Sequence, residues 1–337
     1  MEFATIPETS LRVSRVGLGT WAIGGWMWGG TDDEGSITTI HAAVERGINL
    51  IDTAPAYGFG HSEEIVGRAI AAERLRSRVV IATKVGLEWK DGKVFRNATL
   101  NRILGEVTDS LRRLRTDYID IYQVHWPDPL VSIEETAEAM QTLFDQGKIR
   151  AIGVSNFSVL QIARFRRVAK LHVAQPPYNL FERRIEKELL PYCRESGLAT
   201  LTYGALCRGL LSGKLQEGAH FGGDDLRLTD PKFRPPRFAQ YLAVVRRLDQ
   251  FARDHYGKRV IHLAVRWLLD QGATAALWGA RHPGQLQPID QVYGWSLDTA
   301  AKAEIDRILH ESITDPVGPE FMAPPPRPKI EALEAAE

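Results

Sequence analysis

Short runs of apolar, mostly β-branched residues recur along the chain, and each is followed by a turn and a longer amphipathic stretch. Several runs, such as residues 79–82, are apolar without interruption. Strands that are buried on both faces of a sheet have this pattern. Eight runs are therefore predicted to be strands, beginning near Val16, Ile48, Val79, Tyr118, Ile149, Val173, Ala199 and Thr274.

The amphipathic stretches between these runs predict helices. The helical patterns cover residues 35–46, 63–72, 99–113, 132–146, 158–169, 185–195 and 260–269. Thr99 is a suitable N-cap for the third of these helices. Gly47 and Gly197 are placed where they end the first and the sixth.

The alternation of strand and helix indicates a parallel sheet. Eight repeats match the closed (β/α)8 TIM barrel, whose usual length of about 250 residues leaves room for insertions in a chain of 337. The rival is an open, doubly wound sheet, which requires a Gly-x-Gly-x-x-Gly turn after the first strand. The segment 17–22 lacks the third glycine and has a tryptophan inside the turn. The pattern therefore favours an α/β fold with a TIM barrel in a single domain over residues 1–314.

Four segments lie outside the repeat. Residues 3–13 are predicted to form an N-terminal hairpin that plugs the barrel bottom, and residues 238–255 an extra C-terminal helix. Residues 215–237 form a long loop rich in Gly, Pro and Asp, and such loops are often functional lids. We expect this loop to be a lid, whose cations Arg227, Lys232, Arg234 and Arg237 can meet phosphates when it closes. Residues 315–337 are expected to be a tail that is first Pro-rich and then Ala/Glu-rich, partly without fixed structure.

Composition narrows the class of protein. The 42 basic and 42 acidic residues give a formal net charge of zero, which argues against a nucleic-acid partner. Cys193 and Cys207 are too few for a disulfide framework or a thiolate metal site. No apolar run approaches the roughly 20 residues of a membrane span, and residues 1–10 lack a signal-peptide core. We therefore expect a cytoplasmic protein with no membrane partner, and leave its oligomeric state open.

Polar residues stand where strands two, three and four end. Asp52 and Tyr57 follow the second strand, Lys84 ends the third, and His125 ends the fourth. In a TIM barrel these ends meet at the catalytic mouth. A buried Lys84 needs a partner such as Asp52. Lys84 beside Tyr57 is then expected to lower the tyrosine pKa and make it a general acid for a carbonyl oxygen, which His125 can also hydrogen-bond.

Five motifs in barrel order match a known family: residues 17–21, 51–58, 83–84, 125–128 and 153–157. On these motifs the chain resembles the aldo-keto reductases from Phe3 to about Leu309, and most closely their bacterial branch of inositol-operon-type and stress-related enzymes. The resemblance implies that Asp52, Tyr57, Lys84 and His125 form the catalytic tetrad, with Tyr57 as the proton donor. This group is called the tetrad below.

The resemblance also implies a nicotinamide cofactor across the barrel mouth, NADPH in preference to NADH. Ser155, Asn156 and Gln175 match the positions that hold the carboxamide, and Tyr203 matches the ring that stacks on the nicotinamide. Residues 203–214 resemble the pyrophosphate segment, with Arg208 and Lys214. The adenosine end is expected at Gly279, Arg281 and Gln285, where Arg281 would bind a 2′-phosphate.

The adenine contacts are less clear in the sequence. Pro288 and Ile289 stand where many members of the family carry Glu-Asn, and Asp290 is a candidate replacement.

Tryptophans mark the active end of the predicted barrel. Trp21 and Trp126 follow strands directly, Trp28 and Trp89 lie in loops at the same end, and these four are expected to line an apolar substrate pocket. Arg96 or Lys90 nearby is a weaker candidate for binding an anionic substrate.

We expect NADPH-dependent, reversible reduction of aldehydes or ketones to alcohols, with a small carbonyl compound as the binding partner. The alternative is a nucleotide-bound regulatory subunit that resembles potassium-channel β subunits and has little turnover. A metal-dependent barrel hydrolase lacks a ligand cluster, because His125 stands alone on its strand. No metal is therefore expected.

Overall fold

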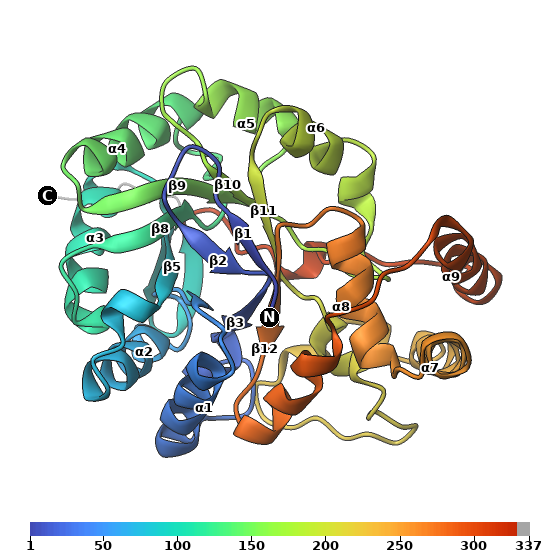
Figure 1. Cartoon of the computed structure of the whole chain (residues 1–337). Helices are drawn as coiled ribbons and strands as arrows, with labels where there is room; N and C mark the ends of the chain where they lie inside the picture. Colours follow the sequence, from blue (N-terminus) through green and yellow to red (C-terminus); the bar gives the residue numbers. More distant parts are fainter. Residues whose placement is uncertain (329–337) are drawn as a thin grey trace, which may run out of the picture.

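The structure is a computed structural model that describes residues 1–328. Eight strands pair in parallel and close into a barrel (Figure 1). In barrel order they are β3 (Val16–Gly19), β4 (Leu50–Asp52), β5 (Val80–Val85), β8 (Ile119–Val124), β9 (Ile149–Ser155), β10 (Val173–Gln175), β11 (Ala199–Thr202) and β12 (Ala275–Gly279). The predicted TIM barrel is confirmed, and the open sheet is wrong.

Helices surround the barrel, with their apolar faces against the strands (Figure 1). They are α1 (Asp33–Glu45), α2 (His61–Ala72), α3 (Leu100–Leu114), α4 (Ile133–Asp145), α5 (Val159–Phe165), α6 (Leu189–Glu195) and α8 (Val260–Asp270), with α7 (Arg237–Tyr256) and α9 (Thr299–Ser312) added toward the C-terminus. Thr99 caps α3, because its side chain accepts a hydrogen bond from the backbone N–H of Arg102. Gly47 and Gly197 have positive φ just after α1 and α6, as predicted for helix ends.

Short 3-10 helices occupy several connections. They are η1 (Trp21–Gly24), η2 (Arg76–Arg78), η3 (Arg184–Glu186), η4 (Cys207–Ser212), η5 (Leu226–Leu228), η6 (Pro231–Phe233), η7 (Pro283–Gln291) and η8 (Glu320–Met322).

The N-terminal hairpin closes the amino-terminal end of the barrel. Strands β1 (Phe3–Thr5) and β2 (Arg12–Ser14) pair antiparallel across that end (Figure 1). Ile6 and Val13 are fully buried against inward-facing strand residues such as Leu50. This confirms the predicted hairpin and leaves the carboxyl ends of the strands as the open mouth.

A second hairpin follows β5 and was not predicted. Strands β6 (Leu87–Lys90) and β7 (Lys93–Arg96) join through a two-residue turn, because Lys90 pairs with Lys93. The sequence signal was present, since Asp91-Gly92 is a favoured two-residue turn. Its strands carry the loop residues Trp89 and Arg96 that sequence reasoning had placed at the mouth.

The described part of the C-terminal segment is bonded to loops at the barrel mouth. The backbone N–H of Arg96 donates to the carbonyl of Pro325 at 2.9 Å, and its Nε donates to that of Pro324 at 2.8 Å. Arg327 lies 3.8 Å from Asp128. Residues 315–328 therefore run from α9 to the loops after β5 and β8, whereas the Ala/Glu-rich part, residues 329–337, lies outside the described residues. Within residues 1–328, no helix is long and apolar enough to cross a membrane.

Candidate active site

A cavity of about 410 Å³ opens at the carboxyl ends of the strands. It is lined by residues of four of the eight barrel strands, β3, β4, β11 and β12, or of the loops that follow them. Its lining includes Trp21, Trp28, Asp52, Tyr57, Tyr203, Arg208, Lys214, Arg227, Gly279, Arg281 and Gln285. Many of the expected site residues therefore meet in one cavity.

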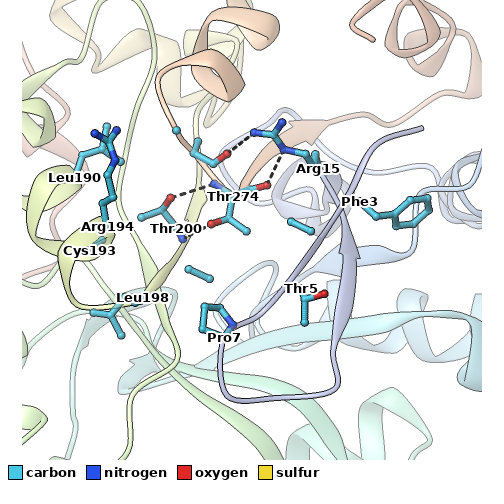
Figure 2. Close-up of a pocket in the computed structure, with 15 residues that line it drawn as sticks. Phe3, Thr5, Pro7, Arg15, Leu190, Cys193, Arg194, Leu198, Thr200 and Thr274 are labelled. Atoms are coloured by element: carbon cyan, nitrogen blue, oxygen red, sulfur yellow. Dashed lines mark hydrogen bonds between the residues drawn. The ribbon is translucent and has the colours of Figure 1, made fainter. Parts of the chain in front are cut away.

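A second cavity lies beside the N-terminal hairpin, at the opposite end of the barrel (Figure 2). Its polar groups are bonded to one another: Thr200 and Thr274 exchange backbone-to-side-chain hydrogen bonds of 3.0 and 3.1 Å. The Nη2 of Arg15 donates to the carbonyl of Ala273 at 3.0 Å. None of the expected catalytic or cofactor residues lines this cavity, so the candidate active site is the one at the mouth.

Lys84 is the central contact of the tetrad. It lies two residues beyond Ala82, the register partner of Asp52, and therefore on the same face of β5 as Ala82. Its Nζ is 2.6 Å from Oδ1 of Asp52, 2.9 Å from the carbonyl of Thr53 and 3.2 Å from the hydroxyl of Tyr57. Lys84 and Asp52 are 1% and 2% exposed, so the expected ion pair is present and is buried.

Two close-packed glycines fix the backbone of Tyr57. A Cβ on Gly24 would lie 2.6 Å from the carbonyl of Tyr57, and Gly58 has φ +68°, a conformation that favours glycine. The ring of Tyr57 stacks on Trp21 at 5.8 Å and meets the edge of His125 at 5.8 Å. The phenol is thus held between an aromatic wall, a lysine and an imidazole.

The protonation states differ from the sequence-based expectation. Burial, with a further contribution from the charge of Asp52, raises the pKa of Tyr57 well above its usual value, so the expected lowering is wrong. Burial lowers the pKa of Lys84, against the opposing effect of Asp52. Burial and the charge of Lys84 lower the pKa of His125 well below its usual value. At neutral pH the site therefore presents a protonated phenol and a neutral imidazole.

Asn156 connects the end of β9 to the tetrad. Its Nδ2 donates to the carbonyl of His125 at 3.0 Å and to Oγ of Ser155 at 3.0 Å. Its Oδ1 accepts the hydroxyl proton of Tyr203 at 2.8 Å. The structure thus brings Ser155, Asn156 and Tyr203 together beside His125.

Gln175, at the end of β10, contacts the tetrad directly. Its Nε2 donates to Oδ2 of Asp52 at 2.7 Å, and its backbone carbonyl accepts the hydroxyl proton of Ser155 at 2.7 Å. Sequence reasoning missed a second amide on the same carboxylate, that of Gln123 on β8. Its signal was an amide residue between Tyr122 and Val124, near the end of that strand.

Cations line the same cavity. Lys214, Arg227 and Arg281 are all lining residues. The Nη1 of Arg281 donates to the carbonyl of Trp28 at 2.9 Å, and its backbone N–H donates to Oε1 of Gln285 at 2.7 Å. This positive region suits a phosphorylated ligand.

Arg208 does not supply a free cation to that region. Its guanidinium is buried, donates to Glu182, and donates through Nε to Asp230 at 2.5 Å. Lys232, expected to reach phosphates from the long loop, is fully buried 2.8 Å from Glu182. These four charges hold the loop to the barrel, because each buried ion has an opposite partner.

Two further loop cations are also engaged elsewhere. Arg234 donates to the carbonyl of Leu228 at 2.9 Å, and Arg237 forms an ion pair with Asp315. Arg227 is the remaining expected loop cation, and it lines the cavity while bonded to Asp225 at 2.5 Å.

The tryptophans divide into two groups. Trp21 and Trp28 line the cavity, in edge-to-face contact at 5.6 Å. Trp89 packs on Phe59 at 5.8 Å, and Trp126 lies under the guanidinium of Arg96 at 5.2 Å. Trp89 and Trp126 are not lining residues.

Two other candidates from the sequence are engaged outside the cavity. Arg96 is occupied by the carbonyls of the C-terminal segment and of Pro127, which removes the anion-binding alternative for this residue. Asp290, the candidate for the adenine, is paired with Arg46 at 2.5 Å, whereas Pro288 lines the cavity. Among residues 1–328, no group of three or more His, Cys, Asp or Glu side chains is arranged to hold a metal ion.

Comparison with known proteins agrees with this geometry. Residues 15–310 match the model of the aldo/keto reductase family. The chain is 61% identical to the aldo-keto reductase YhdN of Bacillus subtilis, over 98% of this chain and 100% of that protein. It is 38% identical to the NADH-specific methylglyoxal reductase of Escherichia coli, over 85% of this chain and 92% of that one.

A solved structure is similar over nearly the whole chain. The glycerol dehydrogenase AKR11B4 from Gluconobacter oxydans superposes with a TM-score of 0.87 at 53% identity, covering 95% of this chain and 99% of that one. The family match, the relatives and the barrel with Asp, Tyr, Lys and His side chains together at its mouth agree. The chain belongs to the aldo/keto reductase family.

Proposed function

We propose that the protein reduces aldehydes or ketones with NADPH, and that Tyr57 donates the proton to the carbonyl oxygen. The observation that carries the proposal is the contact of 3.2 Å between Nζ of Lys84 and the hydroxyl of Tyr57, with Asp52 behind the lysine at 2.6 Å. This arrangement supports a general acid whose conjugate base is stabilised as the proton leaves.

The residues around Tyr57 define how a substrate is oriented. A carbonyl oxygen that accepts the Tyr57 proton also lies within reach of the neutral imidazole of His125, whose ring is 5.8 Å from that of Tyr57. Two hydrogen bonds fix the carbonyl plane and polarise the bond. Lys84 then balances the negative charge on the phenolate, and the buried Asp52 favours the charged form of Lys84.

The cavity supports binding of a phosphorylated nicotinamide dinucleotide. When bound, the cofactor supplies the hydride. Tyr203 and the amide side chains of Asn156 and Gln175 are expected at its nicotinamide end, and the cations Lys214 and Arg281 at its phosphates. We assign the preference for NADPH to Arg281, because a planar guanidinium forms multidentate bonds with a phosphate. A relative named as NADH-specific makes this preference the point to test.

We also propose that residues 215–237 act as a lid over the cofactor. The backbone N–H groups of Met27 and Gly29 donate to Asp224 at 2.7 and 3.2 Å, and the N–H of Leu226 donates to the carbonyl of Met27 at 2.9 Å. These bonds join the two loops that carry the lining residues Trp28 and Arg227. Residues 216–218 are exposed and are the proposed moving part, whereas the buried Lys232 anchors the other end.

Substrate chemistry follows from the pocket and the relatives. Trp21 beside Tyr57 gives the cavity an apolar wall, which suits small uncharged carbonyl compounds. The relatives are named as reductases of carbonyl compounds and as a glycerol dehydrogenase, so oxidation of small alcohols is the same reaction in reverse. These names do not favour the regulatory-subunit alternative.

The test is steady-state consumption of NADPH and of NADH by the purified protein with a panel of small aldehydes, ketones and hydroxyketones. We expect turnover of several compounds, with a higher kcat/KM for NADPH. Binding of NADPH without turnover of any compound would contradict the proposed function and favour a regulatory role.

A further inference from the structure

An amide side chain is buried in the barrel wall behind the tetrad. Gln123 lies on β8, is fully buried, and has the apolar Val124 as its neighbour. Its Nε2 lies 3.4 Å from Oδ2 of Asp52, whereas its Oε1 has no hydrogen-bond partner in the part of the chain that the structure describes. An unpaired buried oxygen costs folding free energy, so an apolar residue of the same shape would serve packing better.

The adjacent strand is adapted to this glutamine. The register of β8 and β9 places Gly153 opposite Gln123. A Cβ on Gly153 would lie 2.7 Å from Cγ of Gln123, closer than real Cβ contacts. The Gln123 amide can lie here only because the facing residue on β9 is a glycine. This observation is independent of the contact between Gln123 and Asp52.

Both oxygens of the Asp52 carboxylate are held by side-chain donors. Lys84 occupies Oδ1 at 2.6 Å, and Oδ2 accepts from Gln175 at 2.7 Å and from Gln123 at 3.4 Å. A carboxylate that is 2% exposed cannot use water to satisfy its lone pairs. The amides come from β8 and β10, and together they define the plane of the carboxylate that faces Lys84.

We propose that Gln123 is a positioning residue for the reduction. With Gln175 it fixes the Asp52 carboxylate, and through it the Lys84 ammonium against the hydroxyl of Tyr57. Gln123 lies behind Asp52 on β8 and, unlike Gln175, is not assigned to the cofactor, so its effect is expected on the proton-transfer step and not on cofactor binding. This inference rests on the proposed function.

The experiment starts from Gln123→Met, which keeps the length of the side chain and removes the donor. We expect kcat to fall about 3- to 10-fold, the effect of one weak hydrogen bond to a charged group. We expect the dissociation constant of NADPH to be unchanged and the unfolding midpoint to stay within about 3 °C. Gln175→Met is the matched control, because it removes the other amide and should weaken NADPH binding as well as kcat.

A double-mutant cycle separates positioning from packing. In an Asp52→Asn background the carboxylate charge is absent, and Gln123→Met is then expected to change the single-turnover rate by less than about 1.5-fold. Gly153→Ala is a second, independent variant, which retains the amide but displaces it. It should also lower kcat in the wild-type background.

The outcomes are distinct. Loss of kcat that disappears in the Asp52→Asn background supports the positioning role. Three results would overturn the positioning role. The first is an equal loss of rate in both backgrounds, and the second is a loss of kcat that parallels a fall in the unfolding midpoint. The third is an unchanged kcat in both Gln123→Met and Gly153→Ala. A wild-type protein without turnover would overturn the proposed function and this inference with it, whereas an active wild type with an unchanged kcat in Gln123→Met overturns only the inference.

Discussion

Replacement of Arg281 by alanine tests the origin of the cofactor preference. Arg281 lines the cavity and makes two kinds of contact there. We assign its guanidinium to the 2′-phosphate of NADPH, and the same group donates to the carbonyls of Trp28 at 2.9 Å and Gly30 at 3.3 Å. The first contact exists only with NADPH, whereas the second holds a loop that both cofactors need.

The two contacts predict different losses. A charge-assisted hydrogen bond to phosphate contributes roughly 1.5–3 kcal/mol of binding free energy. Loss of this contact alone in Arg281→Ala should therefore lower the affinity for NADPH about 10- to 150-fold. The contacts with the loop are hydrogen bonds to neutral carbonyls at the cavity edge. Their loss should lower the affinity for both cofactors about 2- to 10-fold. The preference for NADPH over NADH should therefore fall by at least about tenfold.

The assay is a fluorescence titration of both cofactors with wild type, Arg281→Ala, Arg281→Lys and Arg46→Ala. Arg281→Lys keeps the charge without the planar fork and should give an intermediate preference. Arg46→Ala is the matched control, because Arg46 is a nearby cation paired with Asp290 and is not a lining residue. Equal losses for NADPH and NADH in Arg281→Ala would refute the assignment of Arg281 to the 2′-phosphate.

Two further predictions concern protonation and the lid. Because burial and Asp52 raise the pKa of Tyr57, the phenol stays protonated through neutral pH. The kcat for reduction should therefore stay constant up to about pH 10, while the rate of alcohol oxidation continues to rise with pH. A fall in the kcat for reduction near about pH 8 would contradict this prediction. Bound NADPH should slow tryptic cleavage after Lys214 and Arg227 relative to cleavage after Lys93, the exposed first residue of β7, and unchanged cleavage at saturating NADPH would exclude lid closure.

The barrel was predictable from sequence because its signal is local and repeated. Runs such as residues 79–82 and 149–154 show burial on both faces, and the helices between them have their own periodicity and end signals. The convergence of Asp52, Lys84 and His125 followed from the rule that strand ends meet at one mouth. Each step used information contained within one segment and one general rule of the fold.

The predictions that were wrong concern side chains whose partners lie on distant segments of the chain. Sequence cannot show that Arg208 and Lys232 are paired with Glu182, or that Arg96 is covered by Pro324 and not open to substrate. These pairings join residues far apart in the chain, so their charges appear free until the fold brings their partners in.

Burial was the second source of error. The expected lowering of the Tyr57 pKa considered Lys84 alone, whereas the enclosed site and the charge of Asp52 act in the opposite direction. How completely a side chain is enclosed depends on the whole mouth of the barrel, which no single motif specifies.

The central claim is that Tyr57 donates the proton, and Tyr57→Phe tests it most directly. The variant keeps the ring that stacks on Trp21 and removes only the hydroxyl 3.2 Å from Lys84. We predict that kcat for reduction falls about 10²- to 10⁴-fold, the usual contribution of a general acid, while NADPH binding in a titration is almost unchanged. A Tyr57→Phe enzyme that retains more than about a tenth of the wild-type kcat would contradict the account.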